Sequence, residues 1–520
     1  MKKRRGMFPK SLGLALMLAS ACSGAPHKQV EKPNGLGALK TPEATPILEA
    51  QQAAPKEAPP PSAPARPVSV VKSSWAELGN GLSVASRQDR TLPIVHLRFV
   101  IGSGSAVDEE QTGLAEVCGH AIAYAGAGAM DALGLQKALE AMGATLSVDV
   151  GPDRVVYGIT VARPFLDEVL ALGSAIVSKP RLYEKDFLQL QNALADASEK
   201  KAKTKGQFGA MMVLYRDLFT LPSDHHPYAS YAALSDEIRK IKPSDCKVFH
   251  RRYFVPQNAL VAAAGDIAPL DFRKAVEGAF GKWRGDSAPT PSFTDPMPPE
   301  SSKITLIDYP GQQRAEIVVG TLAPKREEPG FAPFLLATEI IGGAKRGRLF
   351  QALHEKKDLA DPIVSNLLPF QNGPSIFYSY AQTSTRTVAE TLQAMLDART
   401  RLAEEAPTDE EITNAASFLE ARQAVKDSLP GQNADDLDEL WLQKAPDDAP
   451  LSLARALRNT TPVTMTKYVS EFVREGHTVI VVSGDASALG PKLQAFGEVK
   501  VVDPTARFSR TRTLPAENTP

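Results

Sequence analysis

The stretch Ala259–Asp266 (ALVAAAGD) decides the fold, because its pattern occurs again as Thr478–Asp485 (TVIVVSGD). Each copy is a short apolar run that ends in Gly-Asp, as expected for a buried strand followed by a turn. A second pair of runs, Leu97–Gly102 (LRFVIG) and Ala315–Gly320 (AEIVVG), is separated by 218 residues, against 219 for the first pair. Strand-Gly-Asp sequences are common, but two pairs with nearly equal separations predict a tandem duplication.

Composition divides the chain into two bodies of similar length. Apolar residues make up 43% of the 520 residues, enough for large cores. The segment 286–301 is rich in proline and predicts a linker between bodies at 74–285 and 302–505. Residues 506–520 are predicted to be a disordered tail. The prolines of the linker are Pro289, Pro291, Pro296, Pro298 and Pro299.

Each half alternates stretches typical of strands and of helices. The stretch 148–161 is dense in Val and predicts strand, while 184–201 carries apolar residues at helical spacing. Thr408 with Glu411 forms a capping-box pattern, which predicts a helix from there to about Leu429. The sequence therefore predicts an α+β fold, with a mainly antiparallel sheet in each half and helices on one face of it.

The N-terminus resembles a bacterial lipoprotein signal. A basic segment, 2–5, precedes a short apolar run, 12–18, and small residues then lead to Cys22. This pattern predicts that 1–21 is removed and that Cys22 is lipidated. The apolar run is shorter than the roughly 20 residues that span a bilayer, so a transmembrane anchor is the weaker interpretation. An ordinary secretory signal with an incidental cysteine is the alternative.

The segment that follows predicts a tether. Residues 22–73 are rich in Pro, Ala, Lys and Glu, and such a segment buries too little apolar surface to fold. We therefore expect a lipid-anchored, periplasm-facing protein of the cell envelope. Ser23 follows the cysteine, rather than the Asp associated with inner-membrane retention in some bacteria, which by analogy favours the outer membrane.

Charge and cysteine content exclude some functions. Lys and Arg number 59 against 60 Asp and Glu, so nothing in the overall charge predicts a nucleic-acid partner. Three cysteines are too few for a disulfide framework. With Cys22 assigned to lipid, Cys118 and Cys246 remain, and the sequence leaves open whether they pair. We expect Cys118 to be a small buried residue.

An ordered set of motifs resembles the insulinase, pitrilysin and mitochondrial processing peptidase family of zinc peptidases. The resemblance covers residues 74 to 505, and the set is specific although no single motif is. It implies two homologous α+β domains arranged as clam-shell halves around a chamber that admits extended peptides. The motifs are Trp75–Leu78, Asn80–Leu82, Pro93, Gly102–Ser105, Gly113–Ala115, His226–Tyr228, Phe249–Asn258, Gly265–Asp266, Gly342–Gly343 and Arg348–Phe350.

Active members of that family carry H-x-x-E-H on a helix, in which both His bind zinc and the Glu activates a water. On this chain the first His is replaced by Glu116, the base by Gly119, and only His120 remains. The resemblance places a third ligand, a Glu on a later helix, within 189–200. Asp196 and Glu199 are the two acidic candidates there, and the sequence does not decide between them.

These replacements predict the loss of hydrolysis. Glycine has no side-chain proton acceptor, so position 119 cannot activate water. A metal is less clearly excluded, because Glu116 and His120 still share one helix face at i and i+4. A simple ion pair between Glu116 and His120 is the favoured interpretation of the two.

The second half departs from the family at a second place. Active relatives use an Arg and a Tyr there, in a stretch resembling L-R-E-x-x-G-x-x-Y, to hold the substrate. In Leu353–Asp361 of this chain His354 replaces the Arg, Asp358 the Gly and Asp361 the Tyr. A carboxylate repels a developing oxyanion, so Asp361 cannot do the work of a phenol.

The favoured hypothesis is a membrane-tethered, non-catalytic homologue of these peptidases. It would bind an extended peptide or form a heteromer with a catalytically complete family member, with no zinc expected as cofactor. One alternative is a divergent zinc endopeptidase that uses Glu116, His120 and either Asp196 or Glu199. A third possibility is a purely structural lipoprotein of the envelope.

Overall fold

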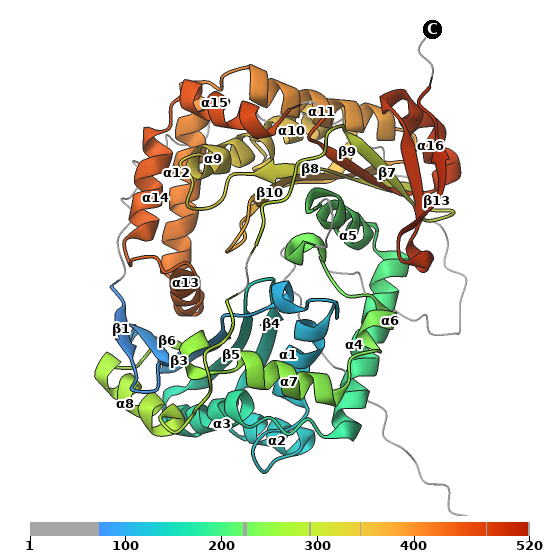
Figure 1. The fold of residues 1–520 in the computed structure, drawn as a ribbon. Coiled ribbons are helices and arrows are strands. Elements are labelled where there is room, and N and C mark those ends of the chain that lie inside the picture. Colours follow the sequence, from blue (N-terminus) through green and yellow to red (C-terminus); the bar gives the residue numbers. More distant parts are fainter. Residues whose placement is uncertain (1–71, 222–225, 291–292, 344, 475, 518–520) are drawn as a thin grey trace, which may run out of the picture. The chain divides into compact units, whose positions relative to one another are not determined.

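The computed structural model describes residues 72–221, 226–290, 293–343, 345–474 and 476–517 (Figure 1). These described residues belong to one compact unit. The predicted signal peptide, Cys22 and nearly all of the predicted tether lie outside the described residues, so they stay predictions. Within the described ranges, no helix combines the length and hydrophobicity needed to cross a bilayer.

The first half contains a mixed sheet with strand order β1-β2-β6-β3-β5-β4. Strands β2 and β6 run parallel, and the other neighbours are antiparallel. Its strands are β1 (Ser74–Glu77), β2 (Ser83–Gln88), β3 (Ile94–Ile101), β4 (Thr145–Val150), β5 (Val155–Ala162) and β6 (Ala259–Gly265). Its helices are α1 (Leu114–Tyr124), α2 (Ala132–Ala141), α3 (Leu166–Ser178), α4 (Glu184–Thr204), α5 (Gly206–Leu218), α6 (Ser235–Ile238), α7 (Pro243–Tyr253) and α8 (Pro269–Phe280).

The second half contains a sheet of order β13-β12-β7-β11-β8-β10-β9, in which β7 runs parallel to β11 and β12. Its strands are β7 (Lys303–Asp308), β8 (Arg314–Ala323), β9 (Ala360–Leu368), β10 (Ser375–Ser384), β11 (Val479–Gly484), β12 (Val499–Asp503) and β13 (Ser509–Leu514). Its helices are α9 (Phe331–Gly342), α10 (Arg348–Phe350), α11 (Val388–Glu404), α12 (Asp409–Asp427), α13 (Pro430–Leu442), α14 (Ala449–Asn459), α15 (Pro462–Phe472) and α16 (Ala486–Leu493).

The repeated runs of the sequence take equivalent places in the two sheets. The first pair forms β6 and β11, and the second pair forms β3 and β8 beside them. The predicted α+β class with two repeated domains is therefore confirmed. Gly265 packs on Val95 and Gly484 packs on Ala315, so Val95, rather than Leu97, is the equivalent of Ala315. The alignment of the two strands from sequence was therefore shifted by two residues. Because side chains alternate between the two faces of a strand, such a shift leaves the apolar pattern unchanged, and the pattern could not reveal it.

Several predicted elements are present with small differences. The capping box of Thr408 and Glu411 opens α12 as expected. The stretch 148–161 forms two strands, β4 and β5, joined by a turn. The described residues of the predicted linker, 286–290 and 293–301, contain no helix or strand. The prediction of a disordered tail is wrong for Ser509–Leu514, which pair with β12 because alternating Arg and Thr suit an exposed edge strand.

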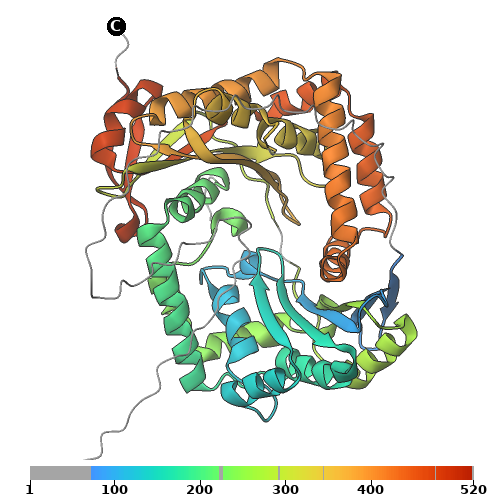
Figure 2. The same cartoon turned by 180° about the vertical axis from the view of Figure 1, so that it is seen from behind.

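Each half also contributes one helix to the other half's sheet. Helix α5 packs on β8 and β11, and α13 packs on β3 and β6 (Figures 1 and 2). The two contacts differ in chemistry. The α5 contact belongs to a large apolar cluster that includes Leu214, Val318 and Val481. The α13 contact has a small apolar cluster around Leu437. Strand β6 is therefore buried on both faces, which explains its unbroken apolar sequence.

Ion pairs supply much of the α13 contact. Arg87 Nη1 lies 3.4 Å from Asp436 Oδ2, and Arg98 Nε lies 2.6 Å from Asp435 Oδ1. Arg154 Nε lies 3.0 Å from Asp438 Oδ1. Two arginines from strands of the first sheet, and one from the turn before β5, thus lie close to three aspartates of one helix. The pairs of Arg87 with Asp436 and of Arg98 with Asp435 orient α13 on that sheet, beside the apolar cluster around Leu437.

One of these aspartates predicts a pH-dependent stability. Burial raises the pKa of Asp438 from 3.8 to about 7; Arg154 opposes the shift, while Glu439 and Asp435 add to it. The folded protein therefore favours the protonated, neutral form of Asp438. This contribution to stability is fully present below about pH 3.8 and is lost as the pH rises through about 7. We expect the melting temperature to fall from pH 5 to pH 8, and to fall less in Asp438→Asn. Equal slopes in the wild type and in Asp438→Asn would contradict this.

Candidate functional site

Helix α1 carries the altered zinc motif, and a buried carboxylate fixes its start. The backbone N–H groups of Gly113 and Ala115 donate hydrogen bonds of 2.7 and 2.8 Å to Asp108. Gly113 has φ = +91°, and a Cβ there would come within 2.4 Å of Ala233 Cβ, so only glycine fits. Burial raises the pKa of Asp108 to about 7, although these two hydrogen bonds lower it. The capping group of α1 therefore titrates near neutral pH.

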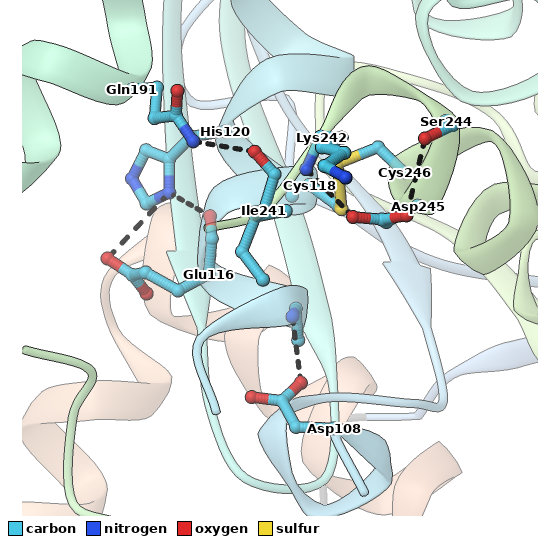
Figure 3. Close-up of a disulfide and its surroundings, with 12 residues drawn as sticks. Asp108, Glu116, Cys118, His120, Gln191, Ile241, Lys242, Ser244, Asp245 and Cys246 are labelled. Atoms are coloured by element: carbon cyan, nitrogen blue, oxygen red, sulfur yellow. Dashed lines mark hydrogen bonds and ion pairs between the residues drawn. A yellow bond between two sulfur atoms is a disulfide. The ribbon is translucent and has the colours of Figure 1, made fainter. Parts of the chain in front are cut away.

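A disulfide ties α1 to its neighbour α7. Cys118 and Cys246 are bonded and fully buried, which answers the question that the sequence left open (Figure 3). Cys118 is buried as the sequence predicted, but its bond to Cys246 was not predicted. The pairing links residues 128 apart in sequence. It holds the zinc-motif helix against the last helix before β6.

Glu116 and His120 lie together, as their i and i+4 spacing predicts. Glu116 Oε1 is 3.9 Å from His120 Nδ1, which is also 2.8 Å from the backbone oxygen of Glu116 (Figure 3). A carbonyl oxygen only accepts hydrogen bonds, so Nδ1 carries the proton. The lone pair that would bind a metal is therefore on Nε2. The Glu116 carboxylate approaches the wrong nitrogen to share an ion with it.

The position of the missing base is filled by the sheet. A Cβ placed on Gly119 would lie 2.9 Å from a methyl carbon of Val150 and 3.4 Å from one of Val155. The backbone oxygen of Gly119 accepts a hydrogen bond of 3.1 Å from Tyr157. Gly119 is therefore both without a proton acceptor and packed tightly against β4 and β5.

The two candidates for a third ligand lie on the exposed face of α4. Asp196 pairs with Arg239 at 2.6 Å and its side chain is 71% exposed. Glu199 pairs with Lys203 at 2.5 Å. The described residues contain no group of three or more His, Cys, Asp or Glu that could hold a metal ion. The structure brings Glu116 and His120 together and leaves Asp196 and Glu199 apart from them.

The residues of this site do not fit a zinc ion of the kind the family resemblance implies. Such a site needs three protein ligands that converge on one point. Here the acid on α1 faces a protonated nitrogen, and both acids on α4 are engaged elsewhere.

The second departure from the family lies where a helical turn leads into β9. His354 Nδ1 is 3.7 Å from Asp358 Oδ1, and its ring lies 4.8 Å from that of Phe350. Asp361 is exposed in β9, which is an edge strand of the second sheet. This turn presents an imidazole and two carboxylates where the family has a guanidinium and a phenol.

Family models match both halves of the chain. A family model described as insulinase (peptidase family M16) matches residues 83–214. A second, described as the peptidase M16 inactive domain, matches residues 240–419. This chain belongs to the insulinase family, M16.

Relatives and solved structures of M16 proteins match over most of the chain. Zinc protease PqqE of Helicobacter pylori is 23% identical over 329 residues, 62% of this chain and 72% of that protein. Cytochrome b-c1 complex subunit 1 of Bos taurus is 24% identical over 279 residues, 53% of this chain and 56% of that protein. A Pseudomonas fluorescens structure titled peptidase M16 inactive domain has a TM-score of 0.72 at 20% identity, covering 80% of this chain and 98% of that one. A Helicobacter pylori protease structure has a TM-score of 0.71 at 18% identity, covering 79% and 99%.

Helix α4 packs beside the motif helix α1 and carries a buried polar residue, Gln191, that sequence reasoning missed. Gln191 lies on the buried face of α4 and is drawn beside His120 in Figure 3. Its Nε2 donates hydrogen bonds of 2.7 and 2.6 Å to the backbone oxygens of Ile238 and Ile241. A neutral amide with a structural role thus occupies the buried face of α4. The helical phase around Phe187 and Leu194 could have revealed that Gln191, and not Asp196, faces inward.

Proposed function

We propose that this M16 protein is a membrane-tethered, non-catalytic homologue of zinc peptidases that binds an extended peptide or pairs with a catalytically complete family member. The observation that carries the proposal is Gly119. The position of the catalytic base has no acceptor, and the space beside it is filled by Val150. Water at this position would have no group to take its proton.

The rest of the site supports the same proposal. Glu116 faces the protonated nitrogen of His120 rather than its lone pair. Asp361 stands where active relatives place a phenol, and a carboxylate cannot stabilise an oxyanion. The catalytic residues are replaced both on α1 and at the turn that leads into β9. This chain is therefore not suited to be the half of a two-subunit enzyme that supplies the Arg and the Tyr, and a binding or pairing role is favoured.

The disulfide supports the proposed location. Buried structural disulfides are typical of exported proteins and rare in the cytosol. The Cys118–Cys246 bond is thus consistent with a protein that carries a lipoprotein signal. We propose that lipid on Cys22 anchors the folded body at the envelope, on the periplasmic side, with the outer membrane preferred.

Pairing has support from one relative. The Bos taurus protein is named as a subunit of a complex, so a chain of this family can serve as one member of an assembly. In such a complex, this chain would contribute a binding surface, and the partner would contribute the catalytic residues.

A test of the proposal measures binding and cleavage in one sample. We expect a fluorescent, unstructured peptide to bind saturably to the full chain, by anisotropy, and to remain intact by mass spectrometry. Alternatively, adding a family member with an intact H-x-x-E-H helix is expected to form a complex by size exclusion. Peptide hydrolysis that is lost in Glu116→Ala or His120→Ala would contradict the proposal, as would the absence of both peptide binding and a complex.

Restoring the base alone is expected to fail. Gly119→Glu introduces a side chain against Val150, and such overpacking costs about 1–3 kcal/mol of stability. Because the ligand set and the Asp361 position remain unsuited to zinc chemistry, we expect no hydrolysis in this variant. Gly119→Ala, which adds only the Cβ, should lose less stability. Hydrolysis by Gly119→Glu would show that the rest of the site is competent.

A further inference from the structure

A cavity of about 830 Å³ lies where residues of both halves meet, and no residue of α1 lines it. Its walls come from β1, from the turn after β3, from the β9–β10 turn and from the end of α13 with the loop that follows. This volume lies within the range of pockets that bind small ligands, about 300–1,000 Å³. None of the altered catalytic positions lines it.

Two tryptophans form aromatic walls of this cavity. Trp75 is 39% exposed, and its Nε1 donates a hydrogen bond of 2.8 Å to Asp447 Oδ1. Asp447 is itself held by the backbone N–H of Ser73 at 3.0 Å. Trp441 packs on Gly102, where a Cβ would come within 3.2 Å of its ring. The structure therefore holds Trp75 in place while leaving much of its side chain open to solvent.

Four amide side chains line the cavity: Gln257, Asn258, Gln371 and Asn372. Asn258 Nδ2 donates to Ser103 Oγ and to the backbone oxygen of Tyr253, both at 3.0 Å, which fixes its orientation. Gln371 Nε2 donates a hydrogen bond of 2.6 Å to the backbone oxygen of Leu442. Gln257 also lines the cavity, and its side chain has no hydrogen bond to another described residue. Both N–H groups of the Asn258 amide are thus used within the protein, whereas the Gln257 amide can both donate and accept.

The charges of the cavity disfavour an anion. Asp153 and Asp447 both line it, against a single cation, Lys444. Lys444 follows the C-cap of α13 with φ = +51°, a position where glycine is usual. Within the described ranges its side chain makes no ion pair, so it stays available to an incoming polar group.

We propose that this cavity binds a neutral oligosaccharide. A sugar ring has an apolar C–H face and a rim of hydroxyls, and this combination matches aromatic faces flanked by amide and carboxylate groups. Trp75 and Trp441 stack against the rings, and the Gln257 amide bonds to the hydroxyls. A purely apolar ligand would leave the amides unpaired, and a phosphorylated one would meet two carboxylates. This site is independent of the proposed peptide and pairing functions.

Tryptophan fluorescence tests the site, because two of the three tryptophans line it. We expect the full chain to give a saturable fluorescence change with at least one of cellotriose, maltotriose and chitotriose, confirmed by calorimetry. Trp75→Ala should weaken that binding about tenfold or more, a loss of about 1.4 kcal/mol or more. Asp447→Asn keeps the ring but weakens the bond that holds it, so it should weaken binding less.

Trp283→Phe is the matched control, since Trp283 does not line the cavity, and its affinity should equal that of the wild type. Unchanged melting temperatures will show that the variants fold. The proposal is overturned if none of the three sugars binds, if Trp75→Ala binds as the wild type does, or if a peptide and no sugar occupies the cavity.

Discussion

Asp436→Ala is expected to lower the free energy of unfolding by about 3–5 kcal/mol. Arg87 is buried in the first sheet, and its Nη1 contacts Asp436 on α13 and Asn433 Oδ1 at 3.1 Å. Lys426 also reaches Asp436, at 3.1 Å. Removing the carboxylate leaves a buried guanidinium facing a second cation, with Asn433 and Ser73 as its remaining partners.

Urea denaturation measures this loss, and Asp435→Ala is the matched control. Asp435 lies on the same helix and also pairs with an arginine, but its side chain is 38% exposed against 10% for Asp436. Because the Arg98–Asp435 pair is more exposed than the Arg87–Asp436 pair, we expect Asp435→Ala to lose less free energy of unfolding than Asp436→Ala. If both variants lose the same free energy, burial does not set the strength of the α13 contact.

Breaking the disulfide is the second large effect. Cys118 and Cys246 close a segment of 128 residues, and the loop-entropy model assigns about 4–5 kcal/mol to a crosslink of that length. We expect the double variant Cys118→Ala with Cys246→Ala to unfold at a clearly lower denaturant concentration. Because α1 is then held to α7 by packing alone, protease cleavage near α1 should also become faster.

The chain's remaining cysteine supplies the control for this experiment. Cys22 lies at the start of the predicted tether, so we expect Cys22→Ala to leave the unfolding midpoint unchanged. Two free thiols per chain in the folded, unreduced protein would contradict the disulfide. An unchanged midpoint in the double variant would show that the bond contributes nothing to stability.

The fold could be predicted from the sequence because its strongest signals are local and repeated. The runs that became β6 and β11 needed only apolar pattern and spacing, and the capping box of Thr408 needed only four residues. The exchange of α5 and α13 between the halves could not be predicted. The helix predicted from Thr408 to about Leu429 ends at Asp427, and Pro430 then opens α13, where its missing N–H costs nothing.

The candidate site was predictable only in part. The i and i+4 rule placed Glu116 beside His120, and glycine at position 119 could be recognised by alignment with the motif. Which nitrogen of His120 faces Glu116 depends on the hydrogen bond between His120 Nδ1 and the backbone oxygen of Glu116, which the residue types alone do not show. The disulfide joins two helices that are far apart in the chain, and three cysteines alone do not fix a pairing.

Zinc content is the most direct test of the central claim, that this site lacks the zinc peptidase machinery. The purified full chain should be incubated with zinc, dialysed and analysed by mass spectrometry of the metal, alongside His120→Ala and a peptide cleavage assay. We predict far less than one zinc per chain, no difference between the two proteins, and no cleavage. One zinc per chain that is lost in His120→Ala together with peptide hydrolysis would contradict the account.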